Sequence, residues 1–65
     1  MLWTDSRAIA MKLEDKHSDV DVLSVRFMDL RRYVLDLEGF EDDPHRCNEK
    51  ILEAIQMAWL DERNA

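Results

Sequence analysis

Apolar residues recur at helical spacing in three parts of the chain, and each part predicts a helix. The first is a narrow stripe in a segment that begins after Thr4 and ends near His17, formed by Ile9, Ala10 and Leu13. The second stripe, within residues 28–39, occupies positions i, i+3, i+4 and i+7: Leu30, Tyr33, Val34 and Leu37. The broadest face lies within residues 44–62 and consists of Ile51, Leu52, Ile55, Ala58 and Trp59. The third helix is therefore expected to be the central packing element.

Residues with special backbone preferences mark the expected ends of these helices. Thr4 is a suitable N-cap for the first helix. Gly39 suits a left-handed position just past the second helix, and Phe40 is expected to pack back onto that helix. Asp43 followed by Pro44 predicts the start of the third helix, because proline favours the first helical position and extends the residue before it.

The segment between the first two predicted helices loses the helical pattern. Val20 and Val22 alternate there with Asp19 and Asp21, which predicts an extended connector with a very short strand. The expected fold class is mainly α: a compact, winged-helix-like domain of three helices with an extended connector, spanning residues 1–65 as one domain.

The composition narrows the possible functions. Fifteen acidic residues against nine Lys and Arg residues give a formal net charge of −6, which repels nucleic acid and attracts cations and basic protein surfaces. The third predicted helix carries no basic stripe, so DNA binding, a common role of three-helix domains, is a distant alternative. No long apolar run or signal-peptide pattern is present, and one cysteine fits a reducing compartment, so a cytoplasmic protein without membrane contact is expected.

The sequence does not support an enzyme. Cys47 has no histidine at a spacing typical of a catalytic pair or a zinc site, and it is interpreted as a small buried side chain. His17 is interpreted as a partner of the helix dipole at the end of the first helix. A chain with a single glycine also has no glycine-rich phosphate loop.

The stretch "DLEGFEDDP", residues 36–44, concentrates five carboxylates around one Gly-Phe turn. An EF-hand is excluded, since Phe40 falls where an oxygen ligand belongs. Asp43, with its neighbours, has a structural explanation as a helix cap, whereas Glu38 would lie at the negative end of the second helix. From these residues alone a solvated loop is the favoured interpretation, with a metal site and a surface for a basic partner as the alternatives.

Four segments resemble the IscX family of small bacterial iron–sulfur cluster assembly proteins: "WTDSRAI", "VRFMDL", "DLEGFEDDP" and "NEKILEAIQMAWLDE". They occur in the family's order and spacing from Trp3 to Glu62, and the last is the most specific. The resemblance implies a winged-helix-like α domain that binds ferrous iron weakly through surface carboxylates. It also implies association with the cysteine desulfurase of the assembly machinery, as a regulator of assembly or as an iron supplier.

By the same resemblance, nine acidic residues are expected to bind the partner: Asp5, Asp29, Asp36, Glu38, Asp42, Asp43, Glu49, Asp61 and Glu62. Weak Fe²⁺ binding is expected at four carboxylates of the turn, Glu38, Glu41, Asp42 and Asp43. The expected protein is a monomeric, non-enzymatic accessory protein. The alternative is an acidic regulator that binds only protein and whose metal affinity is incidental. Two departures from the family pattern are Met28, where threonine is usual, and Gly39, where an acid is frequent.

Overall fold

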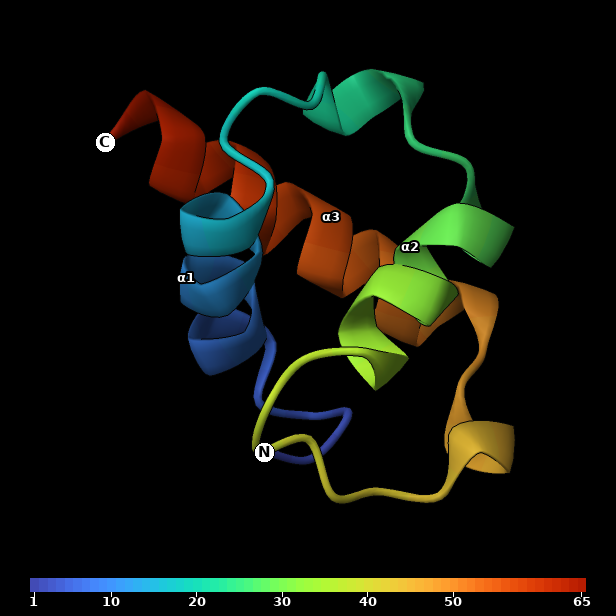
Figure 1. The fold of residues 1–65 in the computed structure, drawn as a ribbon. Coiled ribbons are helices and arrows are strands. Elements are labelled where there is room, and N and C mark those ends of the chain that lie inside the picture. The colour runs from blue at the N-terminus through green and yellow to red at the C-terminus, as the bar shows by residue number, and fades with distance from the viewer.

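The computed structural model describes residues 1–65 and contains only helical elements and the segments that join them (Figure 1). In chain order these are α1 (Ser6–Lys16), the 3-10 helix η1 (Val22–Ser24), α2 (Phe27–Leu35), the 3-10 helix η2 (Pro44–Arg46) and α3 (Glu49–Asn64). The predicted mainly α fold with three helices is confirmed. None of the helices is long and apolar enough to cross a membrane.

The core lies where α3 packs against α1, α2 and η1. Its buried residues are Trp3, Ile9, Ala10, Leu13, Val22, Leu30, Val34, Leu37, Leu52, Ile55 and Trp59. All three predicted apolar stripes face this core; only Tyr33, Ile51 and Ala58 among their members are partly exposed. The prediction that the third helix is the central packing element is therefore confirmed.

The connector between α1 and α2 contains no strand, so the short strand predicted there is wrong. Asp21 instead accepts hydrogen bonds from the backbone N–H of Leu23, at 3.3 Å, and from the hydroxyl of Ser24, at 2.9 Å. These contacts favour a tight turn over extended pairing, because the Asp21 side chain supplies the acceptor that a neighbouring strand would otherwise provide. Without strands, the predicted winged-helix-like character of the domain is not confirmed.

Two predicted helix starts are displaced. The N-cap of α1 is Asp5 rather than Thr4, and the Asp5 carboxylate accepts from the N–H of Leu2, at 2.8 Å, instead of capping the helix. Asp43 does cap a helix that begins with proline, but this helix is the short η2. The chain is extended after η2, and α3 begins at Glu49, where the Asn48 side chain accepts from the N–H of Ile51, at 2.9 Å.

Gly39 has the predicted left-handed backbone, with φ of +86°. It lies in a separate turn rather than directly at the helix end, because α2 ends at Leu35 and the N–H of Phe40 bonds to the carbonyl of Leu37, at 3.2 Å. Phe40 packs edge-on against the ring of Trp3, with 4.7 Å between ring centroids. The turn thereby brings residue 40 onto the N-terminal segment.

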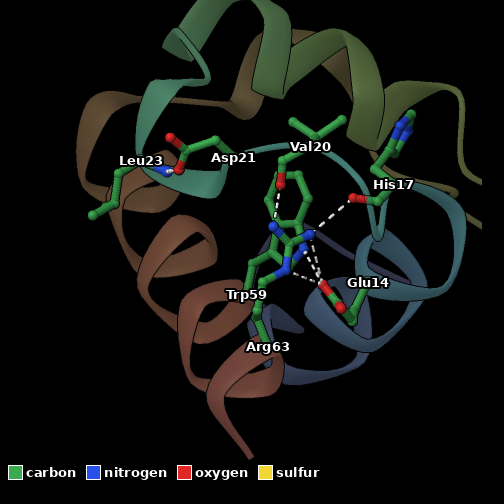
Figure 2. A network of polar contacts seen from close by, with 7 residues as sticks. All are labelled: Glu14, His17, Val20, Asp21, Leu23, Trp59 and Arg63. Atoms are coloured by element: carbon green, nitrogen blue, oxygen red, sulfur yellow. Dashed lines mark hydrogen bonds and ion pairs between the residues drawn. The ribbon is translucent and has the colours of Figure 1, made fainter.

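A polar network around Arg63 joins the last turn of α3 to α1 and the connector (Figure 2). The Arg63 guanidinium donates to Glu14 at 3.0 Å, to the carbonyl of His17 at 2.9 Å and to the carbonyl of Val20. The indole N–H of Trp59 reaches the same Glu14 oxygen, at 3.0 Å. The hydrogen bond from Arg63, with help from Trp59, holds the pKa of Glu14 below its usual 4.5.

Replacing Arg63 with methionine should lower the free energy of unfolding by about 1–3 kcal/mol, because it removes the donor to the Val20 carbonyl, one of two donors to the His17 carbonyl and the ion pair with Glu14. Urea unfolding followed by circular dichroism measures this change. Arg7→Met is the matched control, since Arg7 is mostly exposed and makes a single 3.4 Å ion pair with Glu62. The control should change the free energy by about 0.5 kcal/mol or less. Equal losses in the two variants would contradict the role given to the network.

Candidate functional site

The acidic turn, residues 36–43, leaves the end of α2 and runs beside the N-terminal residues (Figure 1). The N–H of Glu41 bonds to the carbonyl of Met1, at 3.0 Å. Trp3 makes two further contacts: its backbone N–H donates to the Asp42 carboxylate at 3.0 Å, and its indole N–H to the carbonyl of Asp43 at 2.8 Å. The second half of the turn is therefore fixed to the N-terminal segment.

Two of the five carboxylates in the turn are used to hold the backbone. Asp42 accepts from the N–H groups of Trp3 and of Asp43, the latter at 2.7 Å. These two bonds, in that order, hold the pKa of Asp42 below its usual 3.8, with a smaller effect from Arg46 nearby. Asp43 accepts from the N–H of His45, at 2.9 Å. Asp42 and Asp43 thus have a structural role.

The other three carboxylates, Asp36, Glu38 and Glu41, are exposed and form no side-chain hydrogen bond or ion pair. Asp36 and Glu38 border a shallow groove between α1 and the end of α2, which they share with Lys12, Asp15, Lys16 and Leu37. The carboxylates of Asp36, Glu38 and Glu41 face solvent, so these three carboxylates of the turn are available to a ligand.

The predicted iron ligands do not form a chelating cluster. No group of three or more His, Cys, Asp or Glu side chains lies close enough together to hold a metal ion. Of the four predicted ligands, Glu38 and Glu41 are free, whereas Asp42 and Asp43 already bind backbone N–H groups. The residues present therefore do not fit a preformed iron site, and iron binding here remains a prediction.

The remaining predicted partner-binding acids lie at helix ends. Asp5 occupies the N-cap position of α1 and lies beside the acidic turn, since Leu2 and Trp3 join the two. Asp29 and Glu49 occupy the first turns of α2 and α3. Asp61 and Glu62 lie in the last turn of α3, about 18 Å along the helix axis from Glu49. The nine residues consequently do not form one cluster.

The contacts of Cys47 and His17 favour a structural role for both residues. Cys47 is half-buried between η2 and α3, and burial raises the pKa of its thiol in spite of the nearby Arg31. A raised pKa disfavours the thiolate that a nucleophile needs. His17 is the C-cap of α1, as predicted, and its ring stacks on Tyr33 with 4.1 Å between centroids.

The role of Trp3 in fixing the acidic turn was not predicted from the sequence. Its two hydrogen bonds join it to Asp42 and Asp43, which lie 39 and 40 positions further along the chain. No local pattern indicates such a pair, although a tryptophan near a chain end and an acidic turn are each visible in the sequence.

The fold and the acidic turn define a small helical protein that presents unpaired carboxylates on its surface. Residues 1–64 match the family described as iron–sulphur cluster assembly, so the chain belongs to that family, which the IscX resemblance indicated. It is also 52% identical over 62 residues to an uncharacterized protein of Pseudomonas aeruginosa, with 95% of this chain and 94% of that protein covered.

Titration of Asp42 should occur below the usual aspartate value of 3.8, because two N–H donors favour its charged form. Its contribution to stability is present above pH 3.8 and is lost as the pH falls through the lower folded-state pKa. NMR of the side-chain carboxyl carbon measures the midpoint, and the amide proton of Trp3 should shift in parallel. Asp42→Asn should remove the shift at Trp3; a midpoint at or above the usual value would contradict the assigned contacts.

Proposed function

We propose that the protein is a non-catalytic accessory factor of iron–sulfur cluster assembly that docks on the cysteine desulfurase through its acidic surface. Membership of the assembly family supports the process, and the resemblance to IscX supports the partner. The observation that carries the docking mode is the set of three exposed, unpaired carboxylates at the turn, Asp36, Glu38 and Glu41. A basic partner surface attracts such charges and neutralises them on contact. Cytoplasmic location and a monomeric state belong to the same proposal.

The anchored half of the turn supports this docking mode physically. Asp42 and Asp43 fix the backbone to Trp3, so the neighbouring free carboxylates stand on a preorganised loop. A partner then orders only side chains, not backbone, which lowers the entropic cost of association. Asp5 borders the same region, whereas Asp61 and Glu62 lie at the other end of α3 and would form a separate contact.

Ferrous iron is proposed as weakly bound cargo rather than as a resident cofactor. The available donors are the isolated carboxylates of Glu38 and Glu41, which can contribute one or two ligands while water supplies the others. The lack of a chelating cluster supports weak iron binding and also the alternative function, an acidic regulator that binds only protein and whose metal affinity is incidental. Iron binding and desulfurase binding are therefore tested separately.

Charge reversal at the free carboxylates should weaken desulfurase binding. Asp36→Lys combined with Glu38→Lys should lower the affinity about tenfold, as expected for the loss of several interfacial ion pairs. Affinity of the unaltered protein should fall steeply with salt, mainly through slower association. Biolayer interferometry with the cognate desulfurase across a salt series measures both effects.

The matched control is Asp19→Lys combined with Glu53→Lys, which makes the same charge change at exposed acids outside the turn. The connector that carries Asp19 lies at the opposite end of the molecule from the turn (Figure 1). The control should retain most of the affinity. Salt-independent binding, or equal losses in both double variants, would refute docking through the acidic turn.

Titration with iron should show that Fe²⁺ binds at the free carboxylates of the turn, Glu38 and Glu41. Anaerobic addition of Fe²⁺ should broaden amide NMR signals at residues 38–41, with Mn²⁺ competing because no soft ligand is present. Glu38→Gln combined with Glu41→Gln should abolish this broadening without changing the fold. Asp19→Asn combined with Glu53→Gln is the control. Unchanged broadening in the first variant would exclude iron from the turn and leave the protein-binding alternative.

A further inference from the structure

Although the chain is acidic overall, one side of α2 carries unpaired basic residues. The stripe at i, i+3, i+4 and i+7 beside the buried face consists of Met28, Arg31, Arg32 and Leu35. Arg31 donates to the carbonyl of Pro44, at 2.9 Å, so this stripe continues onto η2, which ends at Arg46. These five residues, Met28, Arg31, Arg32, Leu35 and Arg46, are referred to below as the α2 surface.

No residue of the α2 surface forms an ion pair within the molecule, although Arg46 is near enough to Asp42 to lower the pKa of that carboxyl. Only Arg7 and Arg63 of the nine Lys and Arg residues form ion pairs, although the chain has fifteen acids. Arg32 and Arg46 are exposed, and Arg31 is held by a neutral carbonyl rather than by a carboxylate. An Arg31 guanidinium fixed by one bond keeps its other N–H donors in a defined orientation, which suits a carboxylate.

The same surface presents the most exposed large apolar side chain of the protein. Met28 is 79% exposed, more than Leu23, Met11, Leu2 or Met57. Leu35, two turns further along the same stripe, is half-buried. Methionine is flexible and polarizable, so it adapts to a partner's apolar side chain. A thioether flanked by guanidinium groups combines an apolar contact with a rim of positive charge.

We infer that the α2 surface binds a short acidic protein segment that carries an apolar side chain, which packs on Met28 beside Arg32. Charge complementarity supports this occupant, since the unpaired groups are all guanidinium groups. A nucleic acid is disfavoured because Arg46 lies close enough to Asp42 to influence it, so a long polyanion would also meet the acidic turn. This inference goes beyond the proposed docking on the desulfurase, which uses charges of the opposite sign.

The probe is a dye-labelled synthetic peptide of Asp and Glu residues with one central Leu, with binding followed by fluorescence anisotropy at low salt. Arg32→Glu combined with Arg46→Glu should weaken binding about tenfold. Lys12→Glu combined with Lys16→Glu changes the net charge equally at exposed bases of α1 and should have little effect. Peptide addition should shift amide NMR signals at residues 28–35 and 44–46. Equal weakening in both variants would overturn the inference, because it would mean that only net charge matters.

A second comparison tests the apolar contact. Met28→Ser and replacement of the peptide's Leu by Ser should each weaken binding, and the two losses together should be less than additive. Full additivity would overturn the contact with Met28. Tighter binding of a duplex DNA oligonucleotide than of the peptide, at the same salt, would replace the acidic segment with nucleic acid. Reversible dimerisation in sedimentation equilibrium, abolished by Arg32→Glu with Arg46→Glu, would make a second copy of this chain the occupant. Either result overturns the inference.

Discussion

The contacts of Arg63 are the constraint on which the arrangement of the helices depends. Residues 17–26 pass between α1 and α2 with one turn of 3-10 helix and no strand, so backbone N–H groups reach only some of their carbonyls. Arg63 supplies donors to His17 and Val20, while Gln56 donates to the carbonyl of Val22 at 3.1 Å. Because both donors belong to α3, the same helix holds the connector in place and contributes to the apolar core. Eleven buried residues make a small core, so losing these bonds has a proportionately large effect.

Trp3 plays the corresponding part at the other end of the molecule. Its ring is buried against Phe40, and its two N–H groups hold Asp42 and the carbonyl of Asp43. The carboxylates of the acidic turn thereby fall into two groups: those nearest η2 hold the backbone, and those nearest α2 face solvent. This division explains how a dense group of negative charges is tolerated. Part of the repulsion is offset by N–H donors, and the rest remains as a source of binding energy for a positively charged partner.

The sequence predicts the parts of the structure that depend on local periodicity. The three apolar stripes and the left-handed Gly39 are confirmed, since side-chain spacing and backbone preference are properties of a few adjacent residues. The start of α3 was misplaced because Asp43 and Pro44 give the stronger local signal, yet they begin η2 while Asn48 caps the longer helix. The polar network around Arg63 could not be predicted from the sequence, because Glu14 and Arg63 lie 49 residues apart and meet only after α1 and α3 have packed. The four predicted iron ligands form no chelating cluster, and Asp42 and Asp43 bind backbone N–H groups, so iron binding there stays a prediction.

Family membership and charge distribution together constrain how such a protein works. The net charge of −6 coexists with guanidinium groups on α2 that form no ion pair with a carboxylate. Surface ion pairs within the chain would add little stability, about 0–1 kcal/mol each, so leaving them unformed costs the fold little. Unpaired charges instead retain their full attraction for partners of opposite sign, and they form and release contacts quickly at physiological salt. The proposed reversible docking would benefit from such contacts, and a backbone anchored by Trp3 and Arg63 keeps the charged groups in fixed positions.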